Sequence, residues 1–283
     1  MNSFKNIIEN PAQFSKIIVG FFFQSSKNCL SLFRELTYAD PLSVLAVDIL
    51  PINEEFAYQR VVLSVFERKQ FFAQSGVKNV ISMGEAGFKE MKKELHALVN
   101  PERKIFTEIV YLCGMSDQGT EIFKTNFFSS ETNIPSDSSL LHNFGFLYPL
   151  SGTVIAGNKM GRTIGFPTAN LQVDDKNKIL PPMGVYTGWA KIDDNWHKTM
   201  INIGVRPTLN LKTLAIEAHI LGFDGSLYGR TISLHLYEKI RNEKRFASLK
   251  LLKEQLEEDK LSTIKSLDVL NIAPGKDDFL IFA

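Results

Sequence analysis

The sequence is poor in cysteine, the residue on which disulfide-rich domains and most structural zinc sites depend. Its 283 residues contain two cysteines, Cys29 and Cys113, with no CxxC pair and no Cys/His cluster. Neither a disulfide framework nor a zinc site is therefore indicated. So few thiols in a chain of this length are typical of a protein from a reducing compartment.

An excess of one charge and a long apolar run are also missing. The 32 Lys and Arg residues balance 31 Asp and Glu residues to a net charge of +1, which gives no electrostatic reason to expect DNA or RNA as a partner. The longest apolar run near the start, residues 17–23 with Gly20 inside it, is too short for a membrane span and lacks a cleavage site. We expect a cytoplasmic protein that binds neither membrane nor nucleic acid.

The composition is that of an ordinary globular protein, with 44% hydrophobic and 22% charged residues. A length of 283 residues favours two domains. Residues 129–139 read SSETNIPSDSS, a serine-rich stretch with Pro135 inside it, which is typical of a connecting loop. We predict a first domain at 1–135 and a second at 136–283.

The first half alternates strand-like and helix-like segments, which predicts an α/β domain with parallel strand pairing. The expected strands are residues 16–23, 43–49, 79–83 and 104–113. The expected helices are residues 29–37, 58–75 and 85–99. Gly76 is a suitable C-terminal cap for the second of these helices.

The second half consists of short β-rich runs separated by Gly, Pro, Asn and Asp, a pattern that favours a small antiparallel barrel. The expected strands are residues 148–156, 184–192, 197–204, 215–221 and 231–238. A helix is expected from residue 248 to about 261, because Leu249, Leu252 and Leu256 share one face. We expect this helix to pack on the barrel.

Residues 157–171 read GNKMGRTIGFPTANL, with three glycines and the cations Lys159 and Arg162. Glycine-rich turns let backbone N–H groups approach a phosphate, and a nearby cation neutralises its charge. A P-loop is disfavoured, because the glycine spacing is too short, Arg162 stands in the lysine position, and Pro167 blocks the helix that must follow. On glycine content alone, a tight hairpin turn is the simpler interpretation.

Two pairs of polar residues sit at alternate positions, so the members of each pair would share a strand face. Thr168 and Asn170 offer neutral oxygen ligands, which suit Mg²⁺ held mainly by ATP phosphates. Glu217 and His219 lie in an apolar stretch, where the carboxylate is able to accept a proton from an attacking hydroxyl. Taken singly, each pair is also compatible with an ordinary hydrogen-bonded or solvated sheet face.

Taken together, these segments resemble riboflavin kinases, and in particular the C-terminal module of bacterial bifunctional riboflavin kinase/FAD synthetases, across about residues 148–260. Six blocks in the family's order are far more specific than a single glycine motif. The blocks are GRTIGFPTANL at 161–171, PPMGVY at 181–186, NIGVRPT at 202–208, IEAHIL at 216–221, FDGSLYGR at 223–230 and IRNEKRFASLKLLKEQL at 240–256. Gly222 departs from the family, which usually has Asp there.

The resemblance implies a riboflavin kinase, which transfers the γ-phosphate of ATP to the 5'-hydroxyl of riboflavin, giving FMN and ADP. It implies a six-stranded Greek-key barrel with a C-terminal helix, in which Glu217 is the catalytic base. Thr168 and Asn170 are implied ligands of Mg²⁺. The loop over the ATP phosphates is implied to comprise Gly157, Lys159, Gly161 and Arg162. The residues implied to border the isoalloxazine ring are Phe166, Asn242, Glu243 and Phe246.

In the bifunctional family the first domain is a Rossmann-like nucleotidyltransferase that joins AMP to FMN through a G-x-F-D-G-x-H-x-G-H loop. This chain keeps Gly20 and Phe22 but has Ser26 and Cys29 in place of the two histidines. The later S-S-T-x-I-R motif is matched only by residues 129–134, which lack the arginine. We expect a retained fold without most or all FAD synthetase activity.

Alternative functions stay open at this point. Lys27 and other basic groups are able to support a weak adenylyltransferase, which would make the enzyme bifunctional. A non-catalytic flavin or nucleotide binder is a further alternative. The kinase is favoured because Thr168, Asn170 and Glu217 are all present, whereas a binder needs no base beside metal ligands.

Overall fold

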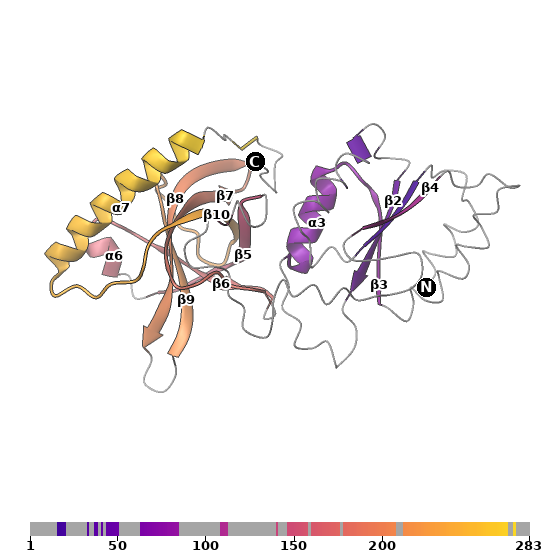
Figure 1. The fold of residues 1–283 in the computed structure, drawn as a ribbon. Coiled ribbons are helices and arrows are strands. Elements are labelled where there is room, and N and C mark those ends of the chain that lie inside the picture. Colours follow the sequence, from indigo (N-terminus) through magenta and orange to yellow (C-terminus); the bar gives the residue numbers. More distant parts are fainter. Residues whose placement is uncertain are drawn as a thin grey trace, which may run out of the picture. The chain divides into compact units, whose positions relative to one another are not determined.

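The computed structural model describes most of the C-terminal half of the chain and separate parts of the N-terminal half (Figure 1). The described segments are residues 16–20, 44–50, 63–84, 108–112, 146–157, 160–175, 178–207, 212–270 and 274–275, with single residues or pairs at 33, 37–38, 41 and 140. The chain divides into two compact units, residues 1–129 with 177–179, and residues 130–176 with 180–283. None of the described helices is both long and apolar enough to cross a lipid bilayer.

The first unit contains a four-stranded parallel sheet in the order β3-β2-β1-β4. Its described elements are β1 (Lys16–Gly20), β2 (Val44–Leu50), α3 (Val65–Gln74), β3 (Asn79–Gly84) and β4 (Glu108–Leu112). All four strands fall where the sequence predicts them, and the predicted parallel pairing is confirmed. The expected helices at 29–37 and 85–99 lie largely or wholly outside the described residues.

Helix α3 begins at a capping box, in which the Ser64 hydroxyl accepts from the Glu67 N–H and the Glu67 carboxylate accepts from the Ser64 N–H. Its side chains Phe71 and Phe72 are buried against Phe33. Glu67 is also buried and pairs with Lys178 at 2.6 Å within the same unit. The helix ends as predicted, with Gly76 at a φ of +74°, where glycine is least strained.

The second unit is built on a closed barrel in the order β10-β5-β6-β9-β8-β7, with every neighbouring pair antiparallel. Its elements are β5 (Tyr148–Ile155), α6 (Met160–Thr163), β6 (Ala169–Val173), β7 (Gly184–Ile192), β8 (Asn195–Pro207), β9 (Lys212–Ile220), β10 (Thr231–Arg241) and α7 (Leu249–Leu270). The predicted six-stranded antiparallel barrel with a C-terminal helix is confirmed.

The barrel interior is filled by apolar side chains at alternate strand positions, as the two-residue period requires. Examples are Leu150 and Val154 on β5, Ile201 and Ile203 on β8, and Leu234 on β10, each at most 2% exposed. Residues between them point outward. The barrel is therefore a packed core, and any ligand must bind on its outer surface or at its ends.

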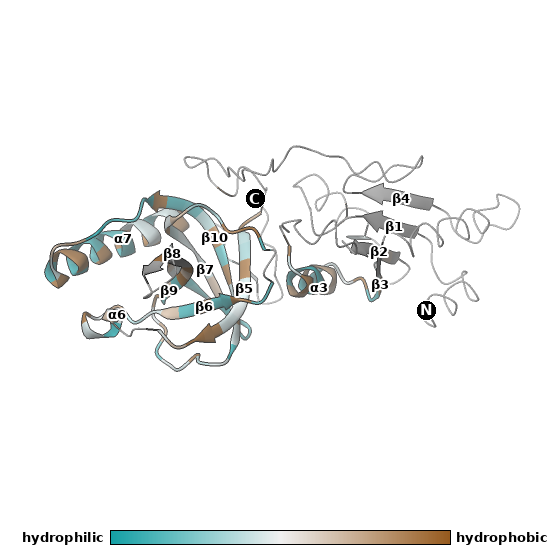
Figure 2. Cartoon of the chain, turned by 90° about the horizontal axis from the view of Figure 1, so that it is seen from below, coloured by the Kyte–Doolittle hydropathy of each residue, from teal (hydrophilic) through white to brown (hydrophobic). Residues whose placement is uncertain are grey.

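Helix α7 packs against β7, β8 and β10, as expected, but it is longer than predicted. It continues nine residues beyond 261, and its three buried residues are Asp259, Thr263 and Leu267. Leu249, expected on the packed face, is 52% exposed. Figure 2 shows hydrophilic and hydrophobic residues mixed along this helix. Leu252 and Leu256 are half-buried on the same face as Asp259 and Thr263, so the predicted face is the packed one, and polar side chains form part of it.

Candidate functional site

Three polar residues form a row across adjacent strands on the outside of the barrel. In the strand register, Asn170 of β6 is opposite Glu217 of β9, and Glu217 is opposite Asn202 of β8. Residues directly opposite one another in an antiparallel pair have Cβ atoms about 5 Å apart. Because Ile216 and Ala218 are buried in the barrel, Glu217 between them points outward. The row therefore presents a carboxylate between two carboxamides.

The glycine-rich segment beside this row folds back on itself in a compact turn. The short helix α6 is followed by hydrogen bonds from the N–H groups of Ile164 and Phe166 to the Gly161 carbonyl, at 3.2 and 2.8 Å. Gly165 has a φ of +88°, which is unfavourable for any residue with a side chain. Arg162 is exposed, whereas Lys159 lies outside the described residues. The structure therefore combines the two interpretations of this segment, a tight turn and a glycine loop beside polar groups.

The Asn170 side chain is held in a notch formed by a glycine. It is 6% exposed, and a Cβ atom placed on Gly157 would lie 2.1 Å from its Nδ2 atom. Thr168 lies just before β6, two residues from Asn170, with its Cγ2 atom 3.7 Å from where a Cβ of Gly161 would be. Gly157 thus lies against Asn170 and Gly161 lies near Thr168, the two predicted metal ligands.

His219 connects this region to the turn that precedes β6. Its Nδ1 lies 2.8 Å from the Pro167 carbonyl, so Nδ1–H donates to that oxygen, and its ring packs against Phe166 at a centroid distance of 5.0 Å. Burial lowers the pKa of His219, assisted by the charge of Lys260 on α7 and opposed by the Pro167 hydrogen bond and by Glu257. The imidazole is therefore neutral near pH 7, and its hydrogen bond links β9 to the turn before β6.

The connection between β10 and α7 reaches the same outer face. A Cβ on Gly204 would lie 1.7 Å from Oε1 of Glu243, so the Glu243 carboxylate occupies the space that a side chain at 204 would fill. Gly204 is two residues from Asn202 on β8 and shares its face. Asn242 is exposed and Phe246 is half-buried in the same connection. Glu243 thus lies next to the row of Asn170, Glu217 and Asn202.

The structure brings most of the predicted site residues to one face. Asn170 and Glu217 are cross-strand neighbours, Gly157 lies against Asn170, and Gly161 lies near Thr168. Phe166 contacts the ring of His219. Sequence reasoning missed Asn202 and Gly204 as site residues. Both lie in the block NIGVRPT at 202–208, and the resemblance of this block to the family was the sequence signal that could have identified them.

The donor set fits a metal ion that is held mainly by phosphates. Within the described ranges, no three His, Cys, Asp or Glu side chains are grouped to hold a metal by themselves. Thr168 and Asn170 instead provide a hydroxyl and a carboxamide oxygen, and the Gly157 notch fixes the position of the carboxamide. Neutral oxygen donors of this kind suit Mg²⁺ that keeps water and phosphate ligands.

Comparison with known proteins identifies relatives of the second half of the chain. Residues 144–267 match the family model described as Flavokinase, riboflavin kinase. The bifunctional riboflavin kinase/FMN adenylyltransferase of Bacillus subtilis (strain 168) is 40% identical over 121 residues, covering 42% of this chain and 38% of that protein. The protein of the same name from Escherichia coli (strain K12) is 40% identical over 134 residues, covering 47% and 41%. These matches span about two fifths of the relatives' own length.

A solved structure resembles a larger part of the chain. The crystal structure of a macrolide-efflux protein from Streptococcus pneumoniae covers 89% of this chain and 94% of its own, at a TM-score of 0.64 and 21% identity. At this identity the likeness concerns the fold alone. The family is established by the sequence matches of the second half together with its closed barrel, so the C-terminal part of this chain belongs to the riboflavin kinase family.

Proposed function

We propose that the protein is a riboflavin kinase, which transfers the γ-phosphate of ATP to the 5'-hydroxyl of riboflavin and releases FMN and ADP. The observation that carries this proposal is the cross-strand row of Asn170, Glu217 and Asn202, with the glycine segment packed on one side of it. Phosphoryl transfer depends mainly on positioning and on neutralising charge. A rigid barrel wall with a base and phosphate-binding groups supplies both.

Glu217 is the proposed general base. It accepts the proton of the ribityl 5'-hydroxyl while the 5'-oxygen forms its bond to the γ-phosphorus and the bond from that phosphorus to the bridging oxygen of ADP breaks. Its position at the centre of the row, on β9 between two other paired strands, keeps its backbone fixed. Asn202, directly opposite, is close enough to orient the carboxylate or the hydroxyl.

The glycine segment is the proposed phosphate side of the site. Backbone N–H groups near Gly157 and Gly161 approach the triphosphate, and Arg162 and Lys159 offset its charge. Thr168 and Asn170 would hold the divalent ion, for which we propose Mg²⁺. When bound, such an ion neutralises charge on the transferring phosphoryl group.

The flavin side is proposed to lie between Phe166 and the connection after β10. Phe166 and Phe246 provide aromatic surface, and Asn242 and Glu243 provide hydrogen-bonding groups for the edge of the isoalloxazine ring. The Glu243 carboxylate already lies on the same face as Glu217. In this proposal both substrates bind against one strand wall.

Chromatographic identification of products tests the proposal. The purified protein is incubated with riboflavin, Mg²⁺ and ATP, and we expect FMN and ADP in equal amounts. A protein that binds riboflavin and ATP but forms no FMN would instead be a non-catalytic flavin binder. The matched control is Glu217→Gln, which should retain binding and lose most of the FMN formation.

For the first unit, we propose a Rossmann-like nucleotidyltransferase fold that has lost most or all of its adenylyltransferase activity. The parallel sheet and the position of Gly20 at the end of β1 support this fold. Ser26 and Cys29, the replacements for the family's histidines, lie outside the described residues. The test is incubation with FMN and Mg-ATP, and FAD formed well above a no-enzyme control would show a bifunctional enzyme.

A further inference from the structure

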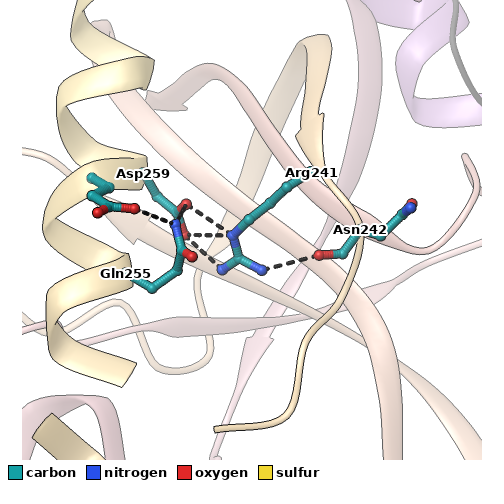
Figure 3. Close-up of polar contacts among 5 residues, drawn as sticks. Arg241, Asn242, Gln255 and Asp259 are labelled. Carbon is teal, nitrogen blue, oxygen red and sulfur yellow. Dashed lines mark hydrogen bonds and ion pairs between the residues drawn. The ribbon is translucent and has the colours of Figure 1, made fainter. Parts of the chain in front are cut away.

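A single guanidinium connects the end of the barrel to the C-terminal helix. Arg241, the last residue of β10, donates from Nε and Nη2 to the Asp259 carboxylate of α7 at 2.6–3.0 Å (Figure 3). The side chains of Arg241 and Asp259 are only 14% and 3% exposed. Gln255, one turn earlier on α7, donates to the same carboxylate at 3.2 Å. Such a forked, shielded ion pair has a defined geometry, unlike a flexible surface pair.

The same guanidinium also contacts the connection that follows β10. Its Nη1 donates to the Asn242 carbonyl at 3.1 Å, and its Cζ lies 5.9 Å from the centre of the Phe246 ring. Residues 242–247 belong to no helix or strand and are mostly exposed. Arg241 thus touches the first residue of this connection, a residue four positions later, and the helix beyond it.

This connection carries Glu243, whose carboxylate fills the notch at Gly204 beside Asn202. An exposed segment of six residues without regular structure would otherwise have many conformations. The contacts of Arg241 with Asn242 and Phe246 reduce the number of these conformations, and they therefore help to fix the positions of Glu243 and Phe246.

We propose that the Arg241–Asp259 pair is a positioning device that holds residues 242–247 in the form that accepts the isoalloxazine ring. This inference rests on the proposed kinase function and assigns the pair to the flavin side of the site, not to the phosphate side. Neither residue takes part in proton or phosphoryl transfer. The pair acts through Asn242, Glu243 and Phe246.

The test compares Asp259→Asn and Arg241→Lys with the wild type. Asp259→Asn leaves the guanidinium without its charge partner, and Arg241→Lys keeps the charge but loses the fork. We expect the KM for riboflavin to rise about 10-fold or more in Asp259→Asn, because small displacements of positioning groups are costly. The KM for Mg-ATP and kcat should stay within about twofold, since the phosphate side is held by other residues. Hydrogen exchange of a peptide covering 242–247 should become faster in both variants.

Asp268→Asn is the matched control. Asp268 is also an α7 carboxylate paired with a strand cation, Lys198 of β8, but it is 61% exposed and far along the helix from the connection. The Asp268→Asn variant should have an unchanged KM for riboflavin and unchanged hydrogen exchange of residues 242–247.

An unchanged riboflavin KM in Asp259→Asn, or equal increases in the KM values for riboflavin and Mg-ATP, would overturn the proposal. If the wild type forms no FMN, the kinase function fails, and the exchange of 242–247 still decides whether the pair fixes the connection. If Asp259→Asn does not fold, Arg241→Lys supplies both measurements.

Discussion

The outer surface of the barrel has two regions that differ in what covers them. Helix α7 packs against β7, β8 and β10, and outward-facing Thr187 of β7 is completely buried. The row of Asn170, Glu217 and Asn202, on β6, β9 and β8, is bordered instead by the glycine segment and by the connection after β10. The apolar interior is common to both regions. The position of the helix therefore leaves this row as the part of the barrel wall that we propose to bind ligands.

Glu217→Gln should have the largest effect. Glutamine keeps the size of the side chain but cannot accept the hydroxyl proton, so kcat for FMN formation should fall by at least about 10²-fold, the scale of a lost general base. Mg-ATP binding, measured by calorimetry, should change little. A near-normal kcat in this variant would show that the row of Asn170, Glu217 and Asn202 contains no essential base.

A second set of variants compares the two neighbours of Glu217 in the row, Asn170 and Asn202, by their effect on the KM for Mg-ATP. Asn170→Ala removes a proposed metal ligand, and Gly157→Ala places a methyl group 2.1 Å from the Asn170 Nδ2 atom. Both should raise the KM for Mg-ATP by about 10- to 100-fold, as loss of a metal-supporting group does. Asn202→Ala, on the opposite side of Glu217, should leave this KM nearly unchanged. Equal KM values for Mg-ATP in all three variants would show that the ATP phosphates do not bind beside Asn170 and the glycine segment.

Gly204→Ala should have a smaller effect, confined to the flavin side. Its Cβ would collide with the Glu243 carboxylate, so this carboxylate must move out of the notch. Because the colliding atoms are the end of an exposed, flexible side chain, the cost in folding stability should be small. We expect a higher KM for riboflavin and an unchanged KM for Mg-ATP. In a double-mutant cycle with Glu243→Ala, the Gly204→Ala penalty should largely disappear, and strict additivity would contradict this contact.

His219→Asn should have the smallest effect, visible mainly as a change in pH dependence. Burial lowers the pKa of His219, so below about pH 6.5 the unfolded chain binds a proton that the folded chain resists. The stability linked to His219 is therefore present above about pH 6.5 and is lost as the pH falls below it. Asparagine keeps a donor for Pro167 but does not titrate. Urea unfolding at several pH values should show a weaker acid dependence for the variant, and identical slopes would exclude this linkage.

Much of the fold could be predicted because alternation and turn residues specify strands locally. The positions of Thr168, Asn170 and Glu217 were predicted from motif resemblance, and the structure brings them to one face. The position of Asn202 opposite Glu217 could not be read from the sequence, since the register between β8 and β9 depends on how the strands pair. Asp259 was also missed, because a carboxylate in a charged helix is usually solvated, and only its partner Arg241, 18 residues earlier, explains its burial.

The closure of the barrel has a consequence for synthesis of the chain. Strand β10 pairs with both β5 and β7, and its partner β5 begins more than 80 residues earlier. Until Thr231 and the residues after it have left the ribosome, the edges of β5 and β7 have unpaired N–H and C=O groups that are able to recruit other chains. Pairing between such distant strands is also slow. Chains that terminate before Thr231 should therefore be aggregation-prone rather than merely inactive.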